Sequence, residues 1–213
     1  SALAASESLS FDQTIKLLKK RGNAMQSAVP KGEGGMLAVL GIELEKLKKI
    51  LEDNKSKYKC FIANDNSNGQ IVLSGKNKDI ESLILDLKKD SIKNIKLPVS
   101  APFHCELMRK ATEVMRKEIE ITEFKKPNNS IVSNVTSIET RDPLQIKELL
   151  IKQIESPVRW RESIIYMVNK GVRKFIEIGP GKVLSGLIKR IDKNLSITNV
   201  NGINDIKNLN IND

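Results

Sequence analysis

The sequence has few of the residues that build metal and redox sites. Among 213 residues there are one histidine, two cysteines and one tryptophan, and aromatic side chains make up 4% of the chain. The cysteines, Cys60 and Cys105, lie far apart and form no standard zinc spacing with a single histidine. Two cysteines also make no disulfide framework. We therefore expect a cytoplasmic protein with reduced thiols, no metal and no cofactor.

Long apolar runs are missing as well. No stretch approaches the roughly 18 apolar residues that a membrane-spanning helix needs. The first residues carry neither a basic leader nor a long apolar region, so we expect no signal peptide. A hydrophobic content of 39% is enough for a substantial core. The length suits one domain or two unequal lobes.

Positive charge is in excess, with a net charge of +10 at neutral pH. The lysines alternate with acidic residues along expected helix faces, as in residues 43–49. This pattern is typical of solvated helix surfaces, so we expect no nucleic-acid partner. The remaining basic residues are suited to attracting an acidic partner.

Residues 31–97 have the pattern of a small separate lobe. Their apolar periodicity predicts the order β-α-β-β-α-β, which is ferredoxin-like. The predicted elements are strands at 36–42, 58–63, 70–74 and 95–99, helices at 43–53 and 78–89, and a turn at 64–69.

Residues 1–30 and 98–213 have an α/β pattern instead. The first helix begins with the capping box of Ser10 and Gln13. Its apolar stripe is expected to run through Phe11, Ile15, Leu18, Gly22 and Met25. After Pro98, strands alternate with helices, which predicts a parallel sheet. The predicted elements are a helix opened by His104, helices at 143–155, 160–170 and 182–192, strands at 130–135, 174–178 and 196–200, and a polar tail.

His104 is the histidine most open to a chemical role, because it follows a predicted strand at the junction of a loop and a helix. A neutral imidazole is a natural general base for a serine. The residue pattern by itself leaves a structural role for His104 open. Cys105 points about 100° away from His104 in a helix, so we expect a buried structural thiol there.

Arg21 and Gln153 are less distinctive. In pattern alone Arg21 reads as a surface cation within a basic run. Gln153 continues an apolar helix face, where an amide without partners costs about 1–3 kcal/mol. A structural network and a site role for Gln153 both remain open.

Six stretches together resemble the malonyl-CoA:acyl-carrier-protein transacylases, in that family's order and spacing. They are residues 18–26, 64–75 (NDNSNGQIVLSG), 97–108 (LPVSAPFHCELM), 131–135, 153–160 (QIESPVRW) and 177–184 (EIGPGKVL). The resemblance implies an α/β-hydrolase-like large lobe, a parallel sheet with helices on both faces, into which the ferredoxin-like lobe is inserted. The large lobe would then comprise residues 1–30 and 98–213, and the small lobe residues 31–97.

The resemblance also implies roles for single residues. Arg21 matches the arginine that binds the malonyl carboxylate, a task that suits a planar guanidinium. His104 matches the catalytic histidine, and Gln153 matches a glutamine whose backbone carbonyl orients it. Phe103 matches the malonyl-selective form of the motif. The implied reaction transfers malonyl from malonyl-CoA to an acidic acyl carrier protein in fatty-acid biosynthesis, with the enzyme as a monomer.

One feature of the family is missing. The family's serine lies in a Gly-His-Ser-Leu-Gly elbow, and no Gly-x-Ser-x-Gly occurs here. Residues 1–5 match the helix just past that elbow. We therefore expect a truncated enzyme whose nucleophile and oxyanion loop lie upstream of Ser1, and we expect the 213 residues alone to be inactive.

Three other functions are open at this stage. A β-α-β-β-α-β lobe in a basic chain could bind RNA, but the strand at 70–74 lacks the aromatic residues that stack bases. A non-catalytic homologue that binds CoA or a carrier protein is a second alternative. The third is the acyltransferase domain of a larger synthase.

Overall fold

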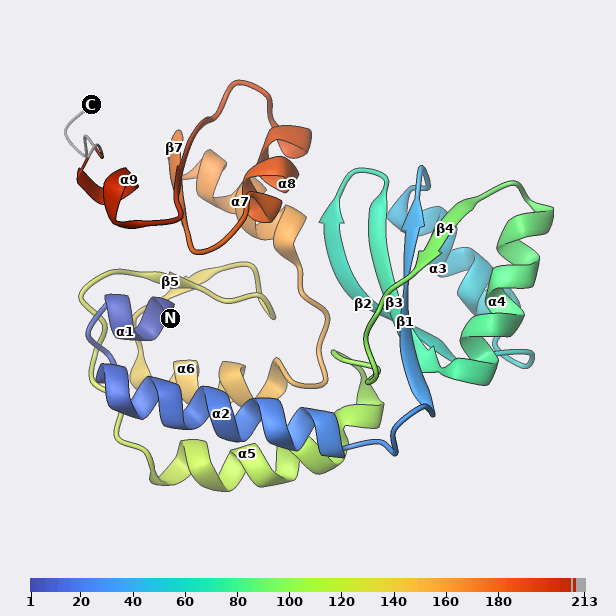
Figure 1. The fold of residues 1–213 in the computed structure, drawn as a ribbon, viewed down its shortest axis with the longest axis horizontal. Helices are drawn as coiled ribbons and strands as arrows, with labels where there is room; N and C mark the ends of the chain where they lie inside the picture. The colour runs from blue at the N-terminus through green and yellow to red at the C-terminus, as the bar shows by residue number, and fades with distance from the viewer. Residues whose placement is uncertain (208, 210–213) are drawn as a thin grey trace.

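The computed structural model of the chain describes residues 1–207 and 209, and Figure 1 shows its elements in order. The helices are α1 Ala2–Ala5, α2 Phe11–Ser27, α3 Leu44–Asp53, α4 Asn77–Lys89, the 3-10 helix η1 Glu106–Met108, α5 Arg109–Ile121, α6 Pro143–Lys152, α7 Trp160–Asn169, α8 Val183–Ile191 and α9 Ile203–Lys207. The strands are β1 Gly34–Leu40, β2 Cys60–Ser67, β3 Gln70–Lys76, β4 Lys93–Lys96, β5 Ile131–Val132, β6 Glu139–Thr140, β7 Lys174–Ile178 and β8 Ser196–Val200.

A four-stranded antiparallel sheet occupies the segment from β1 to β4. Its strand order is β2-β3-β1-β4, and the predicted sequence of elements, β-α-β-β-α-β, is confirmed. Helices α3 and α4 cover one face of the sheet, as Figure 1 shows. The helices bury side chains at i, i+3 and i+7, as an amphipathic helix requires. The fully buried core residues on this face include Leu37, Val39, Leu47, Ile71, Leu73, Ile80, Leu83 and Leu87.

The opposite face of the same sheet packs against the segment that carries Phe103 and His104. Met36, Ala38 and Val72 are buried there, and the half-buried Phe103 packs against them. Phe103 also contacts the separate core formed by α2, α5 and α6. The residue directly before His104 therefore joins the two cores.

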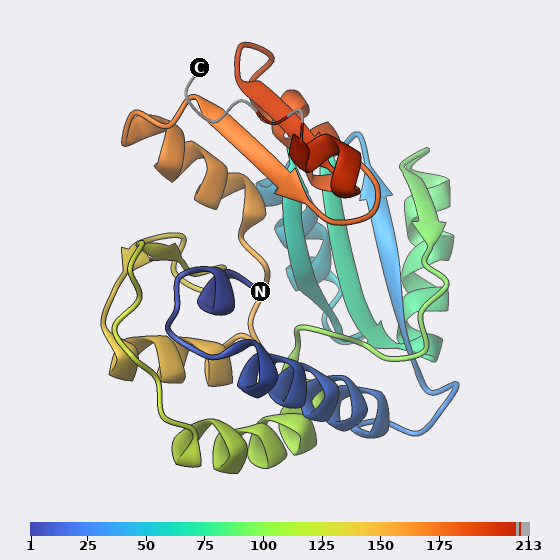
Figure 2. The same cartoon turned by 60° about the vertical axis from the view of Figure 1, so that its left-hand side comes forward.

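Helices α2, α5 and α6 form a second layer, with α2 and α5 side by side in Figures 1 and 2. The predicted capping box is present, since Ser10 Oγ accepts from Gln13 N and Gln13 Oε1 accepts from Ser10 N. The first half of the predicted apolar stripe is wrong, because Phe11 is 75% exposed and Ile15 and Leu18 are about half exposed, whereas Met25 is buried as predicted.

The face of α2 that packs inward is offset by one residue from the predicted stripe. It carries Thr14, Leu17, Ala24 and Met25, at the spacing of an α-helix, and the C-cap residue Ala28 continues it. Arg21 occupies the same face. Contact with α5 and α6, rather than the apolar pattern of α2, sets which side is buried.

The parallel sheet expected after residue 98 appears as one pair in the described part of the chain. Strands β7 and β8 run parallel in register from Lys174↔Ser196 to Ile178↔Val200, and α7 and α8 pack on them. This pair is a sheet of its own, and Figure 1 shows β7 apart from the four-stranded sheet. The strand predicted at 130–135 is only β5, which pairs antiparallel with β6 across a tight turn. It therefore belongs to a hairpin.

Two other local predictions need correction. The turn predicted at 64–69 is confined to Asn68 and Gly69, because β2 continues to Ser67. The outer edge of β2 is paired there: Asp65 N donates to the carbonyl of Val158 at 2.9 Å. The helix expected to open at His104 begins instead with η1 at Glu106.

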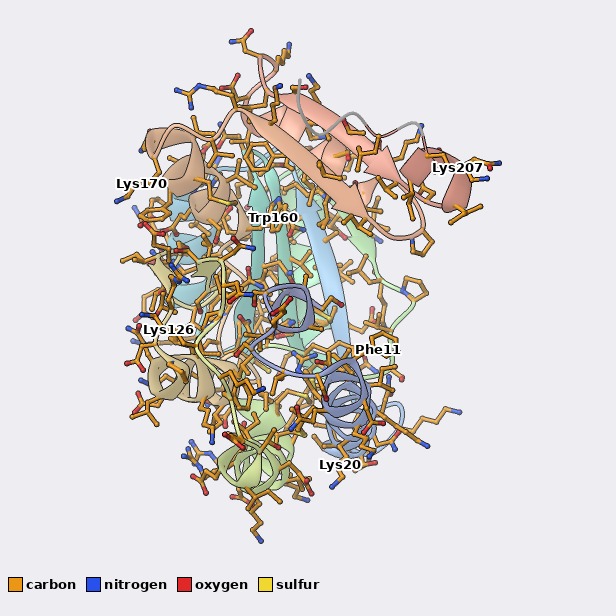
Figure 3. The ribbon with its side chains drawn as sticks, turned by 90° about the vertical axis from the view of Figure 1, so that its left-hand side faces the viewer. Phe11, Lys20, Lys126, Trp160, Lys170 and Lys207 are labelled. Carbon is orange, nitrogen blue, oxygen red and sulfur yellow. The ribbon has the colours of Figure 1, made fainter. Side chains whose placement is uncertain are left out.

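The basic side chains lie mainly on the outside. The labelled lysines in Figure 3, among them Lys126, Lys170 and Lys207, lie around the periphery, whereas Trp160 lies over the sheet. Several lysines pair with acidic neighbours one helical turn away, such as Lys48 with Glu45. No helix within residues 1–207 has the length and apolar character that crossing a membrane requires. Part of the predicted polar tail forms α9, and residues 208 and 210–213 lie outside the described residues.

Candidate active site

Arg21 lies on the inward face of α2. It lines a mostly apolar cavity of about 180 Å³ together with Leu17, Met115, Leu150 and Gln153. Burial lowers the pKa of the Arg21 guanidinium, and within residues 1–207 no carboxylate forms an ion pair with it. A partly desolvated guanidinium without a counter-ion is suited to binding an anion, because burying an unpaired charge is costly.

His104 is held by the end of α6. Its Nδ1 lies 3.1 Å from the backbone carbonyl oxygen of Gln153, which is the C-cap residue of that helix. A carbonyl oxygen only accepts hydrogen bonds, so Nδ1 carries the proton and Nε2 keeps a free lone pair. This is the tautomer that a general base needs. It is also the contact that the resemblance implies for Gln153.

The electrostatic surroundings favour the neutral imidazole. Burial is the main reason that the pKa of His104 lies below its ordinary value, and the positive charge of nearby Arg21 lowers it further. The backbones of Gln153 and Ser156 act in the opposite direction and raise this pKa. The net result is an imidazole that is neutral at pH 7 and able to take up a proton.

The backbone of His104 is in the left-handed region, with φ of 61°. Histidine adopts this conformation more often than most residues, but it remains uncommon outside glycine. Backbone strain of this kind costs on the order of 1–3 kcal/mol and persists only where surrounding contacts impose it. The loop that precedes η1 therefore aims the imidazole at Gln153.

The cysteine beside His104 is structural, as expected. Cys105 is 2% exposed, its Sγ donates to the carbonyl of Pro102 at 3.2 Å, and burial raises its pKa. Burial likewise raises the pKa of Cys60 to about 12. Both thiols are therefore protonated at neutral pH, which makes them poor nucleophiles. In residues 1–207 and 209, no three His, Cys, Asp or Glu side chains are grouped so that they could hold a metal ion.

Sequence reasoning missed the support behind Gln153. The Gln153 side chain donates from Nε2 to the carbonyl of Ser156 at 3.3 Å, which closes the turn that presents the Gln153 carbonyl. A backbone acceptor has no signature in the sequence, so Ser156 could not have been found from the pattern. The amide on an apolar helix face was the available signal, and it marked Gln153 alone.

An ion pair beside the site was also missed. Arg161 on α7 contacts Asp65 on β2, with Nε 2.9 Å from Oδ2, and it reaches Asn68 as well. The Asp65 side chain is 4% exposed. The pair ties the four-stranded sheet to the helix that follows the Gln153 turn.

Comparison with known proteins gives one consistent result. The family model described as acyl transferase domain matches residues 1–208. The malonyl CoA-acyl carrier protein transacylase of Bacillus subtilis (strain 168) is 42% identical over 197 residues, which are 92% of this chain and 62% of that protein. That of Staphylococcus aureus (strain MRSA252) is 39% identical over 215 residues, which cover this whole chain and 70% of the relative.

A solved structure agrees with these relatives. The malonyl CoA-acyl carrier protein transacylase from Clostridium perfringens superposes with a TM-score of 0.92 at 40% identity, covering 97% of this chain and 65% of that one. The chain thus spans a little under two thirds of the Bacillus and Clostridium proteins. Agreement in both sequence and fold over nearly all of the chain means that it belongs to the acyl transferase domain family, among the malonyl CoA-acyl carrier protein transacylases.

Proposed function

We propose that the protein transfers a malonyl group from malonyl-CoA to the phosphopantetheine thiol of an acyl carrier protein, in cytoplasmic fatty-acid biosynthesis. The observation that carries the proposal is the pairing of an anion site at Arg21 with a neutral, oriented imidazole at His104. The names of the relatives agree with this chemistry.

In the proposed reaction His104 serves as the base. Its Nε2 takes the proton of a serine that lies upstream of residue 1, and the serine oxygen attacks the malonyl thioester carbonyl. The thioester C–S bond breaks, and the imidazolium returns the proton to the departing CoA thiolate. The carrier thiol then gives its proton to His104 and attacks the serine ester. The ester C–O bond breaks, and the imidazolium returns the proton to the serine oxygen, which frees the serine.

Arg21 is proposed to hold the malonyl carboxylate. Its guanidinium can grip both carboxylate oxygens, so binding energy comes from a group remote from the reacting carbonyl. Phe103 is proposed to narrow the acyl pocket against a branched substrate. The exclusion of one methyl group is worth about 1–3 kcal/mol.

The architecture proposed for the whole protein has two lobes. Residues 31–97 form the ferredoxin-like lobe, and residues 1–30 and 98–213 belong to the α/β-hydrolase-like lobe. The enzyme is proposed to act as a monomer, with no bound cofactor and with neither a nucleic acid nor a membrane as partner.

The carrier protein is acidic in this proposal, and basic residues at and near α8 are candidates to meet it. Two of the three candidates already have partners within the protein. Lys189 donates to the carbonyl of Leu195, and Arg190 contacts Gln70. Lys182, the N-cap residue of α8, is the third. Carrier binding that is insensitive to salt would contradict this assignment.

The test uses the natural protein that carries this chain. Intact mass is measured after incubation with malonyl-CoA, and one malonyl adduct is expected. Arg21→Ala removes charge-assisted hydrogen bonds worth about 1.5–3 kcal/mol each, so the rate of malonyl loading should fall roughly 100-fold or more. Arg116→Ala is the matched control, because Arg116 is exposed on α5 and, among the residues that the structure describes, pairs with Glu120 alone.

The outcomes separate the functional alternatives. Loading that Arg21→Ala suppresses and Arg116→Ala does not supports the transacylase. A protein that binds malonyl-CoA through Arg21 but never gains the adduct is a binding homologue. Loading that is equally fast with acetyl-CoA and insensitive to Arg21→Ala would sink the proposed carboxylate site.

A further inference from the structure

The segment that leads into His104 is held to two other elements, β1 and α2. Leu97 N donates to the carbonyl of Met36 on β1 at 2.9 Å, and Ser100 Oγ donates to Gln26 Oε1 at 3.0 Å. Ala101 and Pro102 are buried. His104, with φ of 61°, follows Pro102 by only two residues, so a displacement of Pro102 has little chain over which to be absorbed before the imidazole.

Pro102 lies directly against Gly34, the first residue of β1. A Cβ atom placed on Gly34 would lie 2.3 Å from Pro102 Cδ, 2.7 Å from Cγ and 3.1 Å from the backbone nitrogen. These separations are well inside van der Waals contact. The proline ring is bonded to the backbone at both ends, so it cannot swing aside as the end of a flexible side chain would.

The strand is the firmer partner in this contact. Gly34 is paired with Lys76 in the β1–β3 register, and the carbonyl of the preceding Glu33 accepts from Asn77 N at 2.8 Å. A side chain at position 34 would therefore displace the loop at Pro102 rather than the sheet. Overpacking of this kind forces shifts of backbone and rotamers.

We propose that Gly34 is a positioning residue for His104: its lack of a side chain lets the Pro102 ring seat against β1, which fixes the loop so that the imidazole meets the Gln153 carbonyl. The importance of that alignment for catalysis rests on the proposed function. The contact itself does not, so it can be tested without substrate.

The readout is the imidazole of His104, the one histidine in the 213 residues. Heteronuclear NMR of this ring gives its tautomer and its pKa, and a His104→Gln variant verifies the assignment. In the parent protein Nδ1 should carry the proton. In Gly34→Ala that tautomer preference should be lost. The pKa should rise towards the value of an exposed histidine, about 6.5, because burial is the main cause of its lowering.

Gly35→Ala is the matched control. A Cβ atom on Gly35 would lie 2.4 Å from Asn77 Oδ1, so this change also crowds β1. Neighbouring residues of a strand face opposite sides of the sheet, so a Cβ atom on Gly35 would crowd the face opposite to Pro102. Gly35→Ala should therefore leave the tautomer and pKa of His104 unchanged, even where it lowers the melting temperature.

A double variant tests the direct contact. Gly34→Ala/Pro102→Ala removes the Cγ and Cδ atoms that the new Cβ would meet and leaves the backbone nitrogen at 3.1 Å. The double variant should bring the tautomer and pKa of His104 back towards those of the parent. If the two substitutions acted independently, their effects would add and no such recovery would occur. If Gly34→Ala does not fold, the double variant should restore folding.

Either of two results would overturn the proposal. One is a folded Gly34→Ala whose His104 has the parent tautomer and pKa. The other is a double variant that stays as perturbed, or as unfolded, as Gly34→Ala. These NMR measurements involve no acyl transfer. A failed malonyl-loading assay would therefore not affect the positioning role of Gly34, and an unperturbed Gly34→Ala would not affect the proposed malonyl transfer.

Discussion

Removing one partner from the ion pair of Arg161 and Asp65 should strongly destabilise the protein, because it leaves a buried charge alone. Arg161 Nε lies 3.1 and 2.9 Å from the two Asp65 oxygens, and the Asp65 side chain is only 4% exposed. Arg161→Met keeps most of the length of the side chain but removes the guanidinium. The Asp65 carboxylate is then left buried without its partner.

The magnitude follows from that burial. Breaking a buried pair by removing one partner costs about 3–5 kcal/mol. Because the Arg161 side chain is 25% exposed, water can reach part of the site, so we expect the lower end, about 3 kcal/mol. At roughly 2–4 °C per kcal/mol for a chain of this size, the melting temperature should fall by about 6–12 °C.

The assay is thermal unfolding followed by circular dichroism, with two comparison variants. Arg116→Met removes an exposed pair with Glu120 and should cost under about 1 kcal/mol. Asp65→Leu/Arg161→Met removes both charges and should regain most of the loss, because no buried charge is left alone. If Arg161→Met melts within 1 °C of the parent, the desolvation argument is wrong.

Three further outcomes are expected. The pKa of His104 is lowered in the folded state, so on acidification the unfolded chain takes up a proton at this residue first. The free energy of unfolding should therefore fall as pH drops below about 6.5. His104→Gln should remove this contribution to the dependence of stability on pH. Arg21→Gln removes a positive charge and should raise the pKa of His104 in an NMR titration; no change would place Arg21 too far away to act on it. Glu177 caps the start of α8 by accepting from Leu184 N and Ser185 N, so Glu177→Ala should cost about 1–2 kcal/mol in chemical denaturation, and an unchanged midpoint would refute the cap. Hydrogen bonds from Ser185 lower the pKa of Glu177, so this stability should be present above about pH 4.3 and be lost as pH falls through the folded-state pKa.

Local patterns in the sequence predicted much of the secondary structure. The capping box at Ser10 and the proline after Asp142 mark helix starts within a residue of where α2 and α6 begin. The β-α-β-β-α-β segment could be recognised because each strand and helix carries its own apolar period. These signals depend on residues within a few positions of one another.

Predictions that required knowledge of the partner element were less successful. The inward side of α2 is chosen by α5 and α6, so the stripe through Phe11, Ile15 and Leu18 was misassigned. The edge of β2 pairs with Val158, so the strand continues to Ser67. The composition of residues 64–69 had predicted a turn there. Both misassignments come from contacts between residues far apart in the chain.

The sequence alone determined the residue types available for chemistry: one histidine, an arginine in a helix and a glutamine on an apolar face. It also determined the resemblance that linked them. Only the tertiary structure decided that the Gln153 carbonyl meets Nδ1 of His104, that Arg21 lies partly buried without a counter-ion within the described residues, and that Pro102 seats on Gly34. The physical reason is that all three features depend on contacts between segments far apart in the chain. These contacts set the direction of a carbonyl, the desolvation of a charge and the space that a missing Cβ leaves.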